Sequence, residues 1–332
     1  MQVLCPQDKH SRENRPGARV SLLACVSTAT PASEATLRAS PLFEMLDFFD
    51  LTPAPINDSS NPPRIDYRYG IEFAFEQNID HEWVTSVMRD YWWHTVTISI
   101  IYFAVVKSIE RFMRDRKPFE LRPLLFSWNG ILAIFSIIGL IRTFEEFHHA
   151  FFNEGVLDSV CRCFHPTSVG AHWFLFFALS KIVELGDTVF LTLRKRPLTF
   201  LHCYHHASVL IYTFHSGAEH IGSGRNFIVM NFVAHSLMYT YFAITALGIR
   251  INRAIAACVT LVQISQMVIG VAISIFVYYI KTRTDHKCQQ SFGNLKLAFL
   301  IYSSYLVLFV RFFSRTYLSA PKKSVEDKKK SN

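Results

Sequence analysis

The stretch AIAACVTLVQISQMVIGVAISIFVYYI, residues 254–280, contains no charged side chain from one end to the other. A helix needs about 20 predominantly apolar residues to cross the hydrocarbon core of a bilayer, with a usual range of roughly 17–25. This stretch is long enough to cross once. It therefore predicts a membrane-spanning α-helix, and the rest of the sequence decides how many such helices the chain contains.

Six further apolar blocks approach the same length. Of the 332 residues 50% are hydrophobic, and 30 residues are phenylalanine, which is unusual for a soluble domain. We therefore expect an all-α fold, a polytopic membrane protein with seven transmembrane helices. The blocks lie at about 92–110, 123–141, 170–193, 199–215, 226–249, 254–280 and 295–313.

The positive charge of the chain indicates its orientation in a membrane and not a nucleic-acid partner. The formal net charge is +8, but the basic residues occupy short loops and the C-terminus instead of one soluble face with interleaved aromatic residues. Cytoplasmic loops of membrane proteins are enriched in Lys and Arg. We therefore expect the more basic set of loops to be cytosolic. This set comprises 111–122, 194–196, 250–253 and the tail from Arg315, against the alternate loops 142–168, 216–225 and 281–296.

Two short signals agree with this orientation, which places the N-terminus in the lumen and the C-terminus in the cytosol. Asn57 begins the sequon Asn-Asp-Ser before the first block, which predicts a lumenal glycosylation site. Lys329 and Lys330 have the spacing of a dilysine signal for retrieval to the endoplasmic reticulum, and such a signal must face the cytosol. We expect a multi-pass protein of the endoplasmic reticulum membrane.

Three regions differ in composition. Residues 1–80 are polar, rich in Pro, Ser and Asp, and lack a sustained period, so we expect a mostly disordered or loop N-terminal extension in the lumen. Residues 81–318 hold the seven-helix domain, and 319–332 form a cytosolic lysine-rich tail. Met45 is an alternative start, so the sequence leaves open whether residues 1–44 belong to the mature protein.

The third block, 170–193, carries three charged residues at bilayer depth: Lys181, Glu184 and Asp187. Each charge there costs at least about 2.5–3.5 kcal/mol unless it is paired or lines a cavity. The three-residue spacing places them along one side of a helix. The cluster is therefore either a self-neutralising helix contact or one wall of a polar chamber.

The fourth block contains the stretch FLHCYHHASVL, residues 200–210, with three histidines inside an apolar run. At 100° per residue, His202, His205 and His206 share one helical face, whereas Cys203 is rotated off it. Cys203 is therefore a poor candidate for the nucleophile, although a thiol beside imidazoles would be the first suspect.

The next two blocks add polar residues at helical spacing. Asn231, His235 and Tyr239 lie four residues apart and share a face, so we expect them to line the same chamber. Gln263 and Gln266 lie three residues apart in the sixth block. The glutamines either bond neighbouring helices or line the chamber, and the sequence leaves both readings open.

Clustered intramembrane histidines allow two chemistries. A membrane di-iron desaturase or hydroxylase needs about eight histidines in three boxes, and this chain has one such box. His148 and His149 do not complete a second box, because Glu145 occupies the position of its leading histidine. We therefore expect no metal. The second chemistry is acyl transfer, because a neutral imidazole attacks thioesters readily. A non-catalytic seven-helix receptor or transporter remains an alternative that leaves the ordered polar boxes unexplained.

At this point the sequence resembles the membrane fatty-acid elongases, the ELO-type 3-ketoacyl-CoA synthases, over about residues 85–320. KIVELGDT at 181–188 matches the family pattern KxxExxDT, and HCYHH at 202–206 matches HxxHH. HSLMYTYF at 235–242 matches HxxMYxYY except that Phe242 replaces the last tyrosine, and TLVQISQ at 260–266 matches TxxQxxQ. The stretch from Arg116 to Ser136 resembles the first cytosolic loop and second span. HCYHH and this loop favour the subgroup that acts on saturated and monounsaturated acyl-CoA.

The resemblance implies a fold and a reaction. Six of the seven helices would surround a narrow acyl tunnel, with one helix peripheral and the CoA head group at the cytosolic mouth. The enzyme would condense a long-chain acyl-CoA with malonyl-CoA to give 3-oxoacyl-CoA, two carbons longer, CO2 and CoA. No bound cofactor is implied. The partners would be the two CoA thioesters, the bilayer, and the ketoacyl reductase, dehydratase and enoyl reductase of the elongation cycle.

The resemblance also implies roles for individual residues. His205 would take the acyl group, His235 would face it, and His202 and His206 would orient imidazoles or move protons. His235, Asn231, Gln263 and Gln266 are candidates to stabilise the enolate left by loss of CO2. Basic residues at the mouth either bind the CoA phosphates or only set the topology. They are Arg194, Lys195, Arg250 and Arg253.

Three cysteines lie in loops that the charge pattern assigns to the oxidising lumen: Cys161, Cys163 and Cys288. Elongases often have cysteines in these two loops, so the resemblance supports one bridge to Cys288. A cysteine forms a single disulfide, so only one of the first two can pair with Cys288. We predict the pair Cys161–Cys288, with Cys163 as the alternative.

Overall fold

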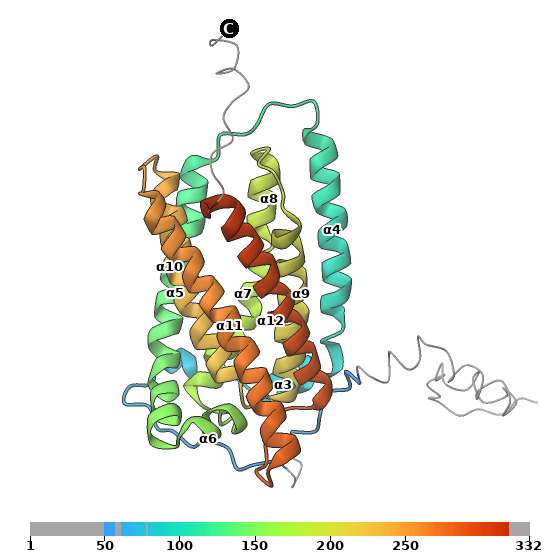
Figure 1. Cartoon of the computed structure of the whole chain (residues 1–332), viewed down its shortest axis with the longest axis vertical. Helices are drawn as coiled ribbons and strands as arrows, with labels where there is room; N and C mark the ends of the chain where they lie inside the picture. Colours follow the sequence, from blue (N-terminus) through green and yellow to red (C-terminus); the bar gives the residue numbers. More distant parts are fainter. Residues whose placement is uncertain (1–49, 57–60, 78, 319–332) are drawn as a thin grey trace, which may run out of the picture. The chain divides into compact units, whose positions relative to one another are not determined.

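Long α-helices account for most of the described chain in the computed structural model, which describes residues 50–56, 61–77 and 79–318 (Figure 1). Helices suit apolar blocks because a helix satisfies its backbone hydrogen bonds internally. Within the described residues no strand forms, and only an isolated bridge pairs Ile65 with Phe164. The all-helical architecture predicted from the sequence is confirmed.

The helices keep the order of the apolar blocks, with short additional segments at the ends. Side-chain caps fix where several of them begin: Thr199 accepts from His202 N at the start of α9, and Ser291 accepts from Asn294 N at the start of α12. The elements are η2 (Ala74–Glu76), α3 (His81–Tyr91), α4 (His94–Met113), α5 (Arg122–His148), η3 (His149–Asn153), α6 (Val156–Cys161), α7 (Val169–Val183), α8 (Gly186–Leu193), α9 (Phe200–Glu219), α10 (Gly224–Ala246), α11 (Arg253–Arg283), α12 (Phe292–Phe313) and η4 (Ser314–Leu318).

Several helices are long and apolar enough to cross a membrane. Among the described residues, length and composition alone select α5 with η3, α10, α11, and α12 with η4. The remaining blocks form α4, the pair α7–α8, and α9. These three are interrupted or contain charged and histidine side chains, which lowers their hydropathy. The chain is therefore a multi-pass membrane protein.

The third apolar block is broken at Glu184 and Leu185, a feature that its composition does not predict. The N–H groups of Leu185, Asp187 and Thr188 each bond a carbonyl three residues back, so the chain tightens by one turn before α8 continues. Gly186 follows the break, and a Cβ there would lie 2.8 Å from the Trp128 ring of α5. The glycine therefore allows α8 to approach α5 closely.

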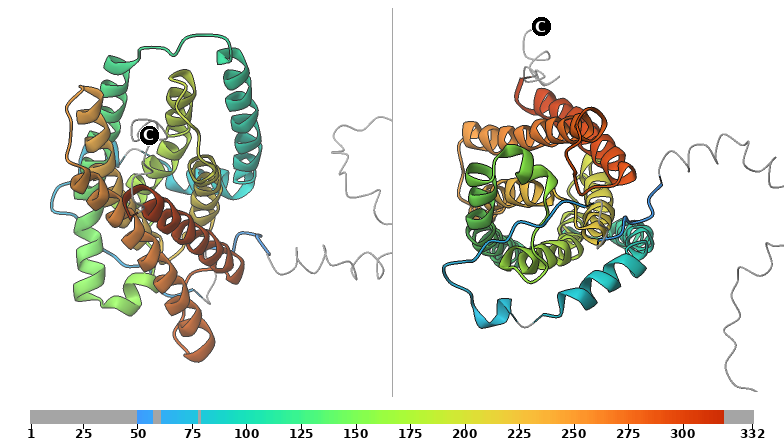
Figure 2. Two further views of the ribbon diagram at one scale, coloured as in Figure 1. Left: turned by 45° about the horizontal axis from the view of Figure 1, so that its top comes forward. Right: turned by 90° about the horizontal axis from the view of Figure 1, so that it is seen from below.

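Packing contacts join six helical units into a closed circuit. Its order is α5, α7, α9, α12, α11 and α10, and α10 returns to α5 (Figure 2). Helix α4 packs mainly against α8 and α9 and lies outside this circuit. The circuit encloses the polar residues that the sequence singled out.

The loops divide between the two ends of the helices as the charge pattern suggested. The connections 114–121, 194–199 and 247–252 and the C-terminal end of α12 lie at one end, which we call the basic end (Figure 1). The connections 162–168, 220–223 and 284–291 lie at the other, which we call the disulfide end.

The segment 61–77 is fastened to the disulfide end by buried polar contacts. Glu76 is 1% exposed and accepts hydrogen bonds from Arg142 at 2.7 and 2.8 Å and from Trp173 at 2.7 Å. Burial alone would raise the pKa of Glu76, but the Arg142 guanidinium and the other donors hold it below its ordinary value. Tyr69 donates to Glu146 at 3.0 Å. This part of the N-terminal extension is therefore ordered against the helices.

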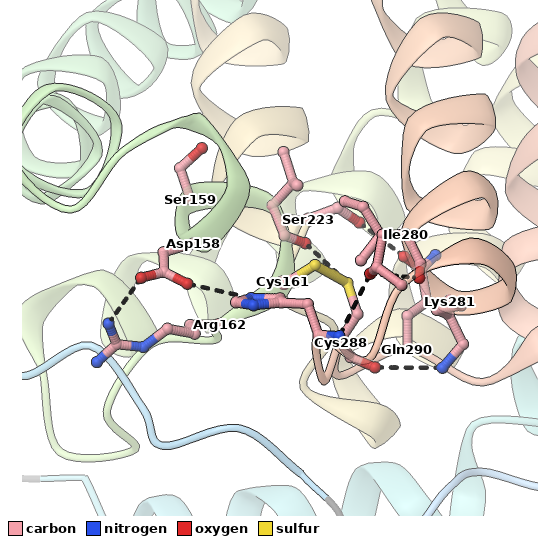
Figure 3. Close-up of a disulfide and its surroundings, with 12 residues drawn as sticks. Asp158, Ser159, Cys161, Arg162, Ser223, Ile280, Lys281, Cys288 and Gln290 are labelled. Carbon is pink, nitrogen blue, oxygen red and sulfur yellow. Dashed lines mark hydrogen bonds and ion pairs between the residues drawn. A yellow bond between two sulfur atoms is a disulfide. The ribbon is translucent and has the colours of Figure 1, made fainter.

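A disulfide joins Cys161, at the end of α6, to Cys288 in the loop before α12 (Figure 3). Their Cα atoms lie 4.2 Å apart. Cys163 is buried and free, and its thiol donates to Gln289 Oε1 at 3.1 Å. Lys281 at the end of α11 donates to the Cys288 carbonyl at 3.2 Å. The structure thus forms the pair predicted from the sequence and leaves the alternative partner reduced.

Loss of this disulfide should lower the stability of the protein. Cys288→Ser opens a loop of 127 residues, for which the chain-entropy model gives an upper estimate of roughly 4–5 kcal/mol. We expect a clear fall in Tm of the detergent-solubilised protein, measured by thermal unfolding. Cys258→Ser, at an exposed free cysteine, is the control and should keep the native Tm. Equal Tm values for the two variants would show that the bridge contributes nothing.

Candidate active site

A cavity of about 710 Å³ lies within the helix circuit and extends toward the basic end. Helices α5, α8, α9, α10, α11 and α12 all contribute side chains to its wall. Near the basic end the wall contains Arg194, Arg196 and Thr245, and in its depth it contains Asn231 and Gln266. The polar residues from separate blocks of the sequence therefore meet in one chamber.

The three histidines of α9 all line this chamber: His202, His205 and His206. The rings of His202 and His206 are 4.5 Å apart between centroids, as expected for residues one turn apart. Cys203 does not belong to the chamber wall. The helical geometry that separates the thiol from the imidazoles is thus present in the structure.

His205 lines both the chamber and a smaller neighbouring cavity, so it lies at the boundary between them. Its ring packs against Tyr305 of α12, with centroids 4.9 Å apart. The Tyr305 hydroxyl lies 2.6 Å from Ser208 Oγ and 3.3 Å from the His205 carbonyl. These contacts hold the imidazole in place from its apolar side and leave the chamber side for a substrate.

The wall formed by α10 is held by a buried ion pair behind it. Lys181 Nζ lies 2.8 Å from Glu184 Oε1 and donates to Asn231 Oδ1 at 2.9 Å. His235 Nδ1 lies 3.4 Å from the same carboxylate oxygen. Lys181 and Glu184 are each 2% exposed and are absent from the chamber wall, whereas Asn231 and His235 line it. The pair therefore orients chamber residues instead of meeting a substrate itself.

Asp187, the third charge of this block, does reach the chamber wall. Its carboxylate accepts from Trp128 Nε1 at 2.6 Å and from the Tyr239 hydroxyl at 2.8 Å. Sequence reasoning assigned no role to Trp128, although it lies in the matched stretch from Arg116 to Ser136. The network ties α5, α8 and α10 together next to the imidazoles.

Gln263 and Gln266 of α11 both line the chamber. Of the two roles that the sequence left open for them, the structure favours lining the chamber over bonding neighbouring helices alone. Gln263 donates to the Met238 sulfur at 3.1 Å, and Gln266 is buried. Phe242, which replaces the family's tyrosine, also lies on the wall. Asn129 of α5 is a further lining residue that sequence reasoning missed.

Two smaller cavities, each of about 40 Å³, continue from the chamber toward the disulfide end. The first shares His205, Asn231 and Gln266 with the chamber. The second shares Phe174 and Ile221 with the first, among others, and reaches α3. Both are lined mainly by apolar and aromatic side chains. The row of cavities suits a molecule with a polar head and a long apolar chain.

A basic pocket of about 560 Å³ opens at the basic end, between the α4–α5 connection and the loop after α8. It is lined by Arg122, Arg194, Lys195 and Arg196, and Arg194 also lines the chamber. Partial burial and the charges of Arg196 and Arg122 lower the pKa of Arg194 from its ordinary value. Glu120 also lines the pocket, so the four basic residues leave the lining with a net positive charge, which suits an anion.

The other basic residues expected at the mouth are placed differently. Arg253 donates to the Thr316 carbonyl and lies over the Tyr317 ring, and Arg250 lines neither the chamber nor the basic pocket. Arg122 and Arg196, which the sequence reasoning did not select, take their place. Asn57, Lys329 and Lys330 lie outside the described residues.

Comparison with known proteins agrees with the motifs. A model of the ELO family, described as GNS1/SUR4, matches residues 87–325. The Caenorhabditis elegans protein named "Putative fatty acid elongase 4" is 49% identical over 264 residues, which is 79% of this chain and 91% of that protein. "Very long chain fatty acid elongase 6" of Drosophila melanogaster is 41% identical over 76% of this chain and 80% of its own length. The Homo sapiens protein of the same name is 36% identical over 77% and 96%, respectively.

Proposed function

The chain belongs to the ELO family and is a fatty acid elongase, a 3-ketoacyl-CoA synthase, and from that premise we propose that His205 carries the acyl group during the reaction. The observation that supports this role is the position of His205 between the polar chamber and the apolar cavities. An acyl chain in the apolar cavities would place its thioester carbonyl at the imidazole. The family resemblance stated from the motifs is confirmed.

In the first half-reaction, a neutral His205 nitrogen attacks the carbonyl carbon of the acyl thioester. A C–N bond forms, the C–S bond breaks, and the CoA thiolate leaves. The imidazole gives up its N–H proton to a neighbouring base, and the thiolate takes up a proton to become CoA thiol. His206, on the chamber wall, is the proposed base, and His202 beside it is the proposed orienting imidazole. Burial keeps water away from the reactive acyl-imidazole.

In the second half-reaction, malonyl-CoA occupies the chamber after CoA has left. Its C–C bond to the carboxylate breaks, CO2 departs, and the electron pair remains as an enolate. We assign stabilisation of the enolate oxygen to donors from His235, Asn231 and Gln266. The enolate carbon then attacks the acyl carbonyl, and the C–N bond to His205 breaks. The departing imidazole nitrogen takes back the proton held by the neighbouring base, and 3-oxoacyl-CoA is released.

Release of labelled CO2 tests this function directly. Membranes that contain the protein should release 14CO2 from carboxyl-labelled malonyl-CoA only when a long-chain acyl-CoA is present. A panel of acyl-CoA lengths in the same assay gives the substrate range, for which we propose saturated and monounsaturated chains. Release that is independent of acyl-CoA would contradict condensation.

We further propose a membrane arrangement built on the helix circuit. Six helical units surround the acyl tunnel, with α7 and α8 counted as one, and α4 is the peripheral helix. The basic end faces the cytosol of the endoplasmic reticulum and the disulfide end faces the lumen, where thiols oxidise. The boundaries 1–80, 81–318 and 319–332 remain the proposed division into extension, catalytic domain and tail. The enzymes of the later elongation steps are the proposed protein partners.

The basic pocket is the proposed site for the phosphates of CoA. Arg194→Gln should raise the KM for acyl-CoA at least about tenfold with little change in kcat, because a hydrogen bond to a charged group contributes roughly 1.5–3 kcal/mol. Steady-state kinetics with purified protein measure the effect. Arg283→Gln is the charge-matched control, because Arg283 lies at the C-terminal end of α11, away from the basic pocket. This variant should keep the native KM. An equal change in both variants would assign the effect to net charge and not to the pocket.

A further inference from the structure

Helix α4 reaches the histidine box although it lies outside the helix circuit. The hydroxyl of Tyr102, in the middle of α4, lies 2.8 Å from Thr188 Oγ1 of α8. The same Thr188 oxygen lies 2.8 Å from His202 Nε2 of α9. Tyr102 is 6% exposed and Thr188 is fully buried. Three helices are thus joined by one hydrogen-bond chain that ends on a chamber imidazole.

The chemistry of the three side chains indicates which group donates and which accepts in each of the two hydrogen bonds. The Thr188 hydroxyl has a single hydrogen, so it can donate to only one of its two neighbours. If it donated to Tyr102, the phenol hydrogen would need another acceptor. Among the described residues the other side chain that can bond the Tyr102 hydroxyl is the Cys203 thiol, a weak acceptor. We therefore assign Tyr102 as the donor to Thr188 and Thr188 as the donor to His202 Nε2.

We propose that Tyr102 is a positioning residue for the condensation reaction, acting through Thr188 to hold His202 as the tautomer that carries its proton on Nδ1. This inference rests on the proposed role of the histidine box. His202 packs against His206, whose own Nδ1 is buried without a hydrogen-bond partner among the described residues. A fixed tautomer of His202 determines which nitrogen can exchange a proton within the box. The outer helix thereby sets the protonation pattern of the active site.

Steady-state kinetics of condensation with purified enzyme, palmitoyl-CoA and malonyl-CoA test the proposal. Tyr102→Phe removes one hydroxyl and keeps the ring, so the fold should survive. We expect kcat to fall about five- to tenfold, as for the loss of one hydrogen bond of about 1 kcal/mol or slightly more, with both KM values unchanged. Thr188→Ser keeps the hydroxyl and should retain kcat, whereas Thr188→Val should lose it.

A double-mutant cycle separates a relay from two independent packing effects. If the groups act as one chain, Tyr102→Phe combined with Thr188→Val should be no slower than Thr188→Val alone. The matched control is Ser99→Ala, one turn away on α4. It removes a hydroxyl that lies 2.8 Å from the Thr95 carbonyl and 3.4 Å from the Ala207 carbonyl of α9, and it leaves the hydrogen bonds from Tyr102 to Thr188 and His202 intact. This variant should keep the native kcat.

The outcomes distinguish the proposal from its premise. A Tyr102→Phe enzyme within twofold of native kcat, a multiplicative double variant, or an equal loss in Ser99→Ala would overturn the positioning role. An active His205→Ala enzyme, assayed in parallel, would instead overturn the proposed function. Loss in Tyr102→Phe and Thr188→Val, retention in Thr188→Ser and Ser99→Ala, and an inactive His205→Ala would support both.

Discussion

His205→Ala is expected to abolish condensation, with kcat lower by at least about a thousandfold, because loss of a nucleophile removes the covalent route and not only a contact. His205 lies on the wall of both the chamber and the first apolar cavity. The substitution leaves a small space beside Tyr305 and breaks no side-chain hydrogen bond of His205 within the described residues, so the variant should fold. Incorporation of labelled malonyl-CoA into 3-oxoacyl products measures the loss.

Cys203→Ser is the matched variant for this prediction, because it lies on the same turn of α9. Its thiol is free and does not belong to the chamber wall. Most of the condensing activity should therefore remain. A well-folded Cys203→Ser protein without activity, together with an active His205→Ala protein, would show that the Cys203 thiol and not the His205 imidazole carries the acyl group.

Lys181→Met should have the largest effect on folding. The substitution leaves the Glu184 carboxylate in the helix circuit without its ammonium partner, whose nitrogen lies 2.8 Å away. Removal of one member of a buried ion pair costs roughly 3–5 kcal/mol. We expect little folded protein after expression, measured as the monodisperse fraction in size-exclusion chromatography, and no condensing activity.

The chain contains a matched control for this pair. Lys107 and Glu110 of α4 have the same three-residue spacing and a nitrogen–oxygen distance of 2.7 Å, but the Lys107 side chain is 76% exposed. Lys107→Met should leave the amount of folded protein unchanged, because exposed pairs contribute little. The double variant Lys181→Met with Glu184→Gln should recover folding, since no charge is stranded, but not activity. Equal folding of Lys181→Met and Lys107→Met would contradict the role of the buried pair.

The sequence predicted the helices and most of the chamber, because both depend on local spacing. Apolar length identifies the blocks, and the period of the α-helix places His202, His205 and His206 on one face of α9. The four-residue spacing of Asn231, His235 and Tyr239 then selects one face of the neighbouring block. The structure brings these residues to one cavity, as such periodic patterns indicate.

The remaining features depend on contacts between helices, which spacing along the chain does not reveal. The break at Glu184 arises where Gly186 meets the Trp128 ring. Trp128 was unassigned because its donation to Asp187 joins residues 59 positions apart. The link from Tyr102 to Thr188 spans 86 positions and involves a helix that the motifs leave peripheral. The basic pocket likewise combines two separate loops, so only two of its four basic residues, Arg194 and Lys195, were selected from the sequence.

Mass spectrometry of the acyl-enzyme tests the central claim most directly. The purified protein is incubated with palmitoyl-CoA in the absence of malonyl-CoA, quenched rapidly, digested and sequenced by fragmentation. We predict one equivalent of CoA released per enzyme and a palmitoyl group on the peptide that contains residues 200–210, localised to His205 and absent in His205→Ala. An acyl group on Cys203, or full turnover without any covalent acyl-enzyme, would contradict the histidine mechanism.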